Sequence, residues 1–153
     1  MIFIRNIVFV SILILLSISD IRKRTIPNPG IAALFVFAIS SLGFDQHMMT
    51  AFCSRMISAV IIAAAVLAVV KSTDSVLTAR TMGMGDVKLI FVIAVYLGFW
   101  NTVYALFGAF AIALIYILLT TEYMRDRLSD NRIPLGPFIS LAAGISALMS
   151  IQY

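Results

Sequence analysis

Cysteine and histidine are nearly absent from this chain, which contains one of each, Cys53 and His47. A single cysteine excludes an internal disulfide and a cysteine metal cluster, and beside Phe52 it is a small packing residue. A single histidine has no partners for a metal site or for a histidine-based catalytic triad. We therefore expect no metal ion and no cofactor.

Charged residues are also scarce, at 12% of 153 residues, whereas 62% are hydrophobic and the mean hydropathy is +1.08. Such a chain has lipid as its main solvent, which excludes a soluble protein. The hydrophobic residues leave no room for a separate soluble domain. We expect one integral membrane domain over residues 1–153.

The hydrophobic residues form separate runs, most of them near the 17–25 residues that a spanning helix needs. The first run is too long for a secretory signal and no small-residue cleavage site follows it, so we expect it to stay as a helix. The fold predicted is all-α and polytopic, with about six transmembrane helices. The runs are residues 2–19, 30–44, 55–71, 86–101, 102–120 and 134–151.

The basic residues predict how these helices are oriented. With the N-terminus outside, one side of the membrane holds only Arg5 and Arg55, and the cytoplasmic side holds all the others. This is a strong positive-inside bias. The net charge of +4 is then a topology signal, and we expect no nucleic-acid partner. The cytoplasmic set is Arg22, Lys23, Arg24, Lys71, Arg80, Lys88, Arg125, Arg127 and Arg132.

Two aspartates, Asp20 and Asp86, lie at the cytoplasmic ends of the first and fourth runs in this topology. A carboxylate at mid-bilayer costs about 2.5–3.5 kcal/mol and less toward the interface, so each is a candidate functional residue. Each also has a simpler interpretation. Asp20 can be a solvated helix-end residue, and Asp86 can favour a helix N-terminus, which typically stabilises by about 0.3–1 kcal/mol.

Glycine and proline gather in the loops on the same side. Pro27 bars helix continuation before Asn28, and Gly83 and Gly85 directly precede Asp86. Glycine allows positive φ and the close approach of another backbone, although small residues also serve helix packing in membranes.

A third feature on this side lies at the start of the last hydrophobic run. Gly136 has no side chain to fill the space around it, and Pro137 suits a first helical turn. Lys88 follows Asp86 by two residues, so on a helix it points elsewhere and reaches the interface or holds the loop. Together with the residues above, these form the predicted active-site loops.

The order of these motifs resembles the type IV prepilin peptidases, a bacterial branch of the intramembrane aspartyl proteases with a glycine-any-glycine-aspartate motif. The resemblance covers essentially the whole chain. It implies that Asp20 and Asp86 are the catalytic pair and that the substrate is a prepilin or pseudopilin, cleaved at the cytoplasmic face of the bacterial inner membrane. The matching segments are Asp20 with Ile26-Pro27-Asn28, Gly83-Met84-Gly85-Asp86-Val87-Lys88-Leu89, and Pro134-Leu135-Gly136-Pro137-Phe138.

The chain departs from larger members of that family, which carry a methyltransferase region with paired cysteines. Here the first hydrophobic run begins at residue 2. We expect a short, peptidase-only form, with methylation left to a separate enzyme.

Two carboxylates that share one proton can supply both the base and the acid of peptide hydrolysis, and their titration belongs to the pair. Which aspartate is the base stays open, as do the particular pilin and the oligomeric state. The acidic residues Glu122, Asp126 and Asp130 could attract a basic leader peptide.

Two alternatives remain open. A small transporter could use the aspartates as a proton relay, although relay acids normally lie nearer mid-membrane. A non-catalytic scaffold of a pilus or secretion machine would tolerate Asp→Asn at either position.

Overall fold

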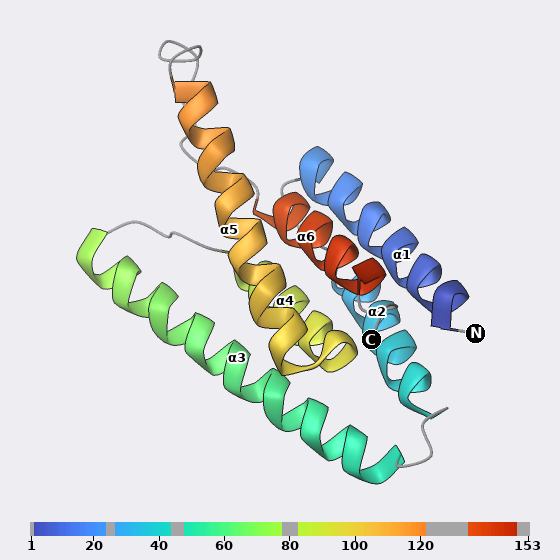
Figure 1. Cartoon of the computed structure of the whole chain (residues 1–153). Helices are drawn as coiled ribbons and strands as arrows, with labels where there is room; N and C mark the ends of the chain where they lie inside the picture. The colour runs from blue at the N-terminus through green and yellow to red at the C-terminus, as the bar shows by residue number, and fades with distance from the viewer. Residues whose placement is uncertain (1, 24–26, 44–47, 78–82, 122–134, 150–153) are drawn as a thin grey trace.

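The computed structural model describes residues 2–23, 27–43, 48–77, 83–121 and 135–149, which form six α-helices and no strand (Figure 1). One helix corresponds to each hydrophobic run, so the all-α prediction is confirmed. The helices are α1 (Ile2–Lys23), α2 (Asn28–Leu42), α3 (Met48–Leu77), α4 (Met84–Leu97), α5 (Phe99–Thr121) and α6 (Gly136–Met149).

Three of the described helices, α1, α3 and α5, are long and apolar enough to cross a membrane, over Phe3–Arg22, Met49–Thr73 and Phe99–Leu119. The other three have 14 or 15 residues, fewer than the roughly 20 of a typical span. The chain is thus a helical membrane protein. Six spans and an external N-terminus stay predictions.

Several predicted helix limits differ from the structure. The break between the fourth and fifth helices falls at Gly98, not after residue 101, because Gly98 has φ +80° and ends α4. The Gly98 N–H donates to the Ala94 carbonyl at 2.9 Å, and the Gly98 carbonyl accepts from the Thr102 N–H as α5 begins. Helix α3 extends well past both ends of the predicted run at residues 55–71.

Helix α4 forms the centre of the bundle. From Leu89 to Leu97 all its residues are buried except the half-buried Phe91, and the helix packs against α2, α3, α5 and α6. Helix α3 runs diagonally along one side of it in Figure 1. A helix that is apolar on all sides is suited to this enclosed position.

Small residues let α6 approach its neighbours closely. Helices α1 and α6 lie side by side in Figure 1 and run in opposite directions. A Cβ on Gly144 would lie 3.6 Å from Val10 of α1, and a Cβ on Gly108 of α5 would lie 3.6 Å from the Ala142 Cβ. Without a hydrophobic driving force in lipid, such close packing is what associates helices.

A buried polar network joins the helices at the end of α4 that is opposite Asp86. The Tyr96 hydroxyl donates to Asn6 Oδ1 at 2.6 Å, and Asn6 Nδ2 donates to the Ala147 carbonyl at 2.5 Å. Phe9 stacks on the Tyr96 ring with centroids 3.8 Å apart, and Arg55 donates to the Tyr96 carbonyl. These contacts fix α1, α3 and α6 relative to α4.

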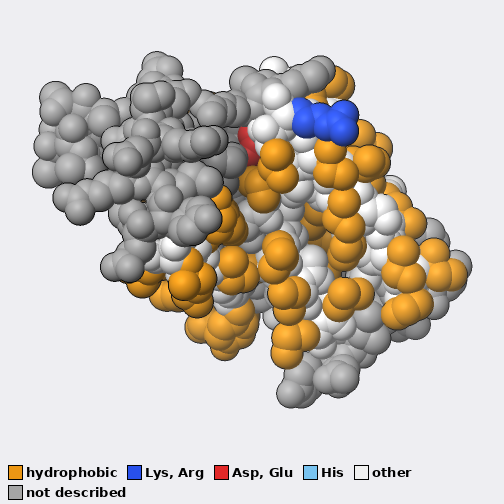
Figure 2. Space-filling model, turned by 90° about the horizontal axis from the view of Figure 1, so that it is seen from above, with side chains coloured by type: hydrophobic (Ala, Val, Ile, Leu, Met, Phe, Trp, Pro, Cys, Tyr) orange, Lys and Arg blue, Asp and Glu red, His pale blue; other side chains and the backbone are white. Residues whose placement is uncertain are grey.

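The described surface is largely hydrophobic. Seen from above in Figure 2, apolar side chains cover most of the coloured area, and basic and acidic side chains occupy small patches. An apolar exterior of this kind suits contact with lipid.

Candidate active site

Asp20 lies in the last turn of α1 and is buried, with 6% of its surface exposed. The backbone N–H of Gly136, the first residue of α6, donates to its carboxylate. The first N–H groups of a helix have no partner within it, and they carry the positive end of the helix dipole. Helix α6 therefore offers a stabilising donor to a carboxylate on another helix.

Asp86 lies in the first turn of α4, three residues after the N-cap Gly83, and is half-buried. Its carboxylate accepts from the Gly83 N–H, and its own N–H donates to the Gly83 carbonyl at 3.1 Å. An acidic side chain that reaches back to the N-cap N–H forms half of a capping box. This local bond orients the Asp86 side chain.

The structure brings the two aspartates together from opposite ends of their helices. Asp20 is near the C-terminus of α1 and Asp86 is near the N-terminus of α4, and their carboxylates are close enough to interact electrostatically. Two like charges at one site disfavour double ionisation, so the pair tends to hold one proton. The arrangement can supply an acid and a base side by side.

Gly136 is required by the position of Asp20. A Cβ on Gly136 would collide with Asp20 Oδ2 and lie 3.1 Å from Asp20 Cγ. The absence of a side chain therefore lets the carboxylate rest on the start of α6. Pro137 follows in the first helical turn, as its sequence position predicts.

Gly83 and Gly85 do not use the positive φ that glycine allows. Gly83 has φ −75°, which any residue can adopt, and Gly85 is the second residue of α4. Gly98 is the positive-φ glycine of the described residues. A Cβ on Gly83 would lie 3.6 Å from Asp86 Oδ2, an ordinary contact. The close approach of another backbone that these glycines would allow stays a prediction.

Lys88, one turn into α4, meets Asn28 at the start of α2. Lys88 Nζ donates to Asn28 Oδ1 at 3.3 Å, and both residues are exposed. This bond joins the start of α2 to the first turns of α4. Pro27 is the N-cap of α2, and its carbonyl accepts from the Gly30 N–H at 3.0 Å. Lys88 thus contacts the first residue of α2, and a role for it in the active site stays a prediction.

Two residues near the aspartates were not identified from the sequence. Gly30 lets α2 approach α1, because a Cβ there would lie 2.5 Å from Leu16 Cδ2, one turn before Asp20. Ser140 lies one turn after Gly136 on α6, is 5% exposed, and its hydroxyl has no hydrogen-bond partner among the described residues. The sequence offered one indication of this position: Ser140 follows Gly136 by four residues, which places both on the same face of a helix.

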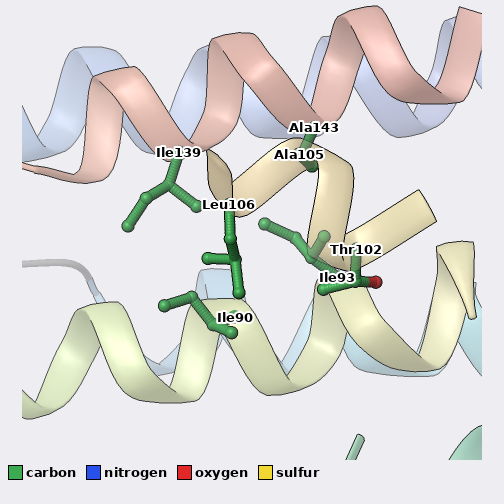
Figure 3. A pocket seen from close by; sticks show the side chains of 7 residues that line it. All are labelled: Ile90, Ile93, Thr102, Ala105, Leu106, Ile139 and Ala143. Atoms are coloured by element: carbon green, nitrogen blue, oxygen red, sulfur yellow. The ribbon is translucent and has the colours of Figure 1, made fainter. Parts of the chain in front are cut away.

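Away from the aspartates, a narrow crevice lies between α4, α5 and α6 (Figure 3). It has no room for a water molecule, and its one polar group, the Thr102 hydroxyl, donates to the Gly98 carbonyl at 2.6 Å. We assign it no ligand. Its lining residues are Ile90, Ile93, Thr102, Ala105, Leu106, Ile139 and Ala143.

Within the described ranges, no three side chains of the metal-binding types come together. The acidic residues Glu122, Asp126 and Asp130, and Pro134 of the third motif, lie outside the described residues.

Comparison with known proteins gives one match. Residues 7–118 match the model of the type IV leader peptidase family, and this range includes both aspartates. No curated protein and no solved structure matches the chain significantly. The matched range covers well over half of the sequence. This helical membrane protein therefore belongs to the type IV leader peptidase family.

Proposed function

We propose that this protein is a membrane aspartyl endopeptidase that removes the short basic leader from type IV prepilins or pseudopilins, with Asp20 and Asp86 as its catalytic pair. In this proposal the aspartates face the cytoplasm at the border of the inner membrane, as the distribution of basic residues predicts. Membership of the leader peptidase family supports the reaction class.

One observation carries the assignment of the pair. Two carboxylates on different helices interact with each other, and each accepts a hydrogen bond from a backbone N–H, of Gly136 for Asp20 and of Gly83 for Asp86. A lone helix-capping aspartate accounts for the Gly83 bond. It does not account for a second buried carboxylate placed against it, since like charges repel.

The chemistry follows from one shared proton. The ionised carboxylate takes a proton from water as the water oxygen attacks the scissile carbonyl carbon, and the protonated carboxyl gives its proton to the carbonyl oxygen. In the collapse of the tetrahedral intermediate, the amine nitrogen takes a proton from the first carboxyl and the C–N bond breaks. A hydroxyl proton of the intermediate passes to the second carboxylate, which restores the starting state.

The test is leader cleavage of a co-expressed prepilin, followed as a mobility shift. We expect cleavage by the wild type and none by Asp20→Asn or Asp86→Asn, with all three proteins at equal levels in the membrane. Asp45→Asn is the matched control, because the predicted topology places Asp45 on the other side of the membrane.

Cleavage that survives either substitution at the pair would reject the dyad. If both variants also support pilus or secretion assembly, the scaffold alternative gains. No cleavage by the wild type would point to another substrate or to the transporter.

A further inference from the structure

Gly30, in the first turn of α2, is a glycine that its own backbone conformation does not require. Its φ is not positive, and glycine is among the poorest helix formers. There is little room for a side chain, because a Cβ on Gly30 would lie 2.5 Å from Leu16 Cδ2 and 3.5 Å from Pro27 Cγ. The close packing of α2 against α1 therefore accounts for this glycine.

Leu16 connects this packing contact to the candidate active site. It is buried, with 4% of its surface exposed, and it precedes Asp20 on α1 by four residues. Side chains four residues apart lie on the same face of a helix. The face of α1 that packs against Gly30 therefore also carries the Asp20 carboxylate.

The first turns of α2 also contact α4. Asn28 Oδ1 accepts from Lys88 Nζ at 3.3 Å, and Lys88 follows Asp86 by two residues. Further along α2, the ring of Phe35 lies against that of Phe91 of α4, with centroids 6.1 Å apart. One end of α2 is thus in contact with both helices that carry the aspartates.

Helices α1 and α4 have two neighbours in common, α2 and α6, and each packs more against these two than against the other. At the end away from the aspartates α1 and α4 meet directly, where Phe9 stacks on Tyr96. At the aspartate end, their separation therefore depends on how closely the starts of α2 and α6 pack against them. Gly136 is the close contact on the α6 side, and Gly30 is the close contact on the α2 side.

We propose that Gly30 is a positioning residue of the aspartyl pair, and that it sets the separation of Asp20 from Asp86 by letting α2 lie close against α1. The inference rests on the proposed function and deepens it. Two carboxylates share one proton, and act together on one peptide bond, only when they lie close together. A shift of about 1 Å in one catalytic group can cost about 100-fold in rate.

The experiment measures kcat and KM for leader cleavage by the purified full chain with Gly30→Ala and with Gly30→Val. Leu16 Cδ2 is the end of a flexible side chain and can turn aside for one methyl group. We therefore expect kcat to fall about threefold in Gly30→Ala and about 30-fold in Gly30→Val, which adds two further methyl groups. KM should change by less than about twofold, because Gly30 acts on the acids and not on the substrate.

A second substitution tests the contact itself. Leu16→Ala removes the atoms that a side chain at position 30 would meet, so adding it to Gly30→Val should restore kcat about tenfold. Leu16→Ala alone empties a buried site and lowers stability. A purely structural role for Gly30 therefore predicts a double variant that is worse than either single one, and not a rescue.

Ala38→Val is the matched control, because Ala38 is fully buried on the same helix about two turns further from the aspartate end. It should lower the unfolding temperature and leave kcat per folded molecule unchanged. Wild-type kcat in Gly30→Val would overturn the inference, and so would an equal loss of kcat in Ala38→Val or the absence of rescue by Leu16→Ala. If Gly30→Val does not fold, Gly30→Ala with and without Leu16→Ala decides in the same way.

Failure here is distinct from failure of the proposed function. A fully active Gly30→Val enzyme beside an inactive Asp20→Asn enzyme rejects the role of Gly30 and keeps the dyad. An active Asp20→Asn enzyme rejects both.

Discussion

At the scale of single residues, the site depends on what is absent at Gly136 as much as on the two acids. The Asp20 carboxylate occupies the space that a side chain at position 136 would fill. The same glycine supplies the N–H that binds this carboxylate. Gly136 therefore leaves space for the Asp20 carboxylate and also binds it. A methyl group added at this position should displace the carboxylate while the protein still folds.

We expect Gly136→Ala to lower leader cleavage about 100-fold, because the added Cβ displaces Asp20 and misplacement of a catalytic group by about 1 Å costs that much. The measurement is the cleavage rate of a prepilin per amount of membrane-inserted protein. Gly108→Ala is the matched control, since its Cβ would make an ordinary 3.6 Å contact with Ala142. Equal rates for Gly136→Ala and wild type would contradict this account of the Asp20 position.

At the scale of helices, the site is assembled from helix ends. Asp20 lies in the last turn of α1, Asp86 lies in the first turn of α4, and Gly136 begins α6. Backbone N–H groups that lack intrahelical partners are therefore available where the carboxylates meet. The start of α2 is tied to the first turns of α4 by the bond from Lys88 to Asn28. Because this hydrogen bond joins two side chains, substitutions made singly and together can test whether it matters for cleavage.

Lys88→Met and Asn28→Ala should each slow cleavage by about fivefold, and the double variant should be no slower than either single one, because all three lose the same hydrogen bond. Rates are compared at equal membrane levels, with Lys71→Met as the control at an exposed lysine of α3. If the effects of the two single variants multiply in the double variant, the two residues act independently and the link has no functional role.

At the scale of the whole molecule, the contacts that stabilise the bundle and the two aspartates lie at opposite ends of it. The aspartates meet at one end of α1 and α4, and the network of Tyr96, Asn6 and Arg55 lies at the other. Polar contacts between membrane helices typically contribute about 0.6 kcal/mol and up to about 1.7 kcal/mol. The Tyr96 network thus fixes the helices relative to one another at the end away from the aspartates.

Tyr96→Phe should lower the free energy of unfolding by about 1 kcal/mol, because Asn6 Oδ1 is left buried without its donor. Thermal unfolding in detergent micelles measures the change. Tyr104→Phe, at a side chain that is 66% exposed, should leave the unfolding temperature unchanged. The cleavage rate per folded molecule should match wild type in both, and a selective loss of rate in Tyr96→Phe would show that the far end also acts on the site.

The sequence alone determined the membrane class, the all-helical fold, the number of described helices and the family motifs, because composition, hydrophobic run length and helix-breaking residues act locally. It misplaced the break between α4 and α5. The two apolar runs are continuous in sequence, and the positive φ of Gly98 sets where the first helix ends. Only the tertiary structure decided that Gly136 lies on Asp20 and that Lys88 reaches Asn28. Such contacts join residues far apart in the chain. They depend on the depth and rotation of each packed helix, which no local pattern encodes.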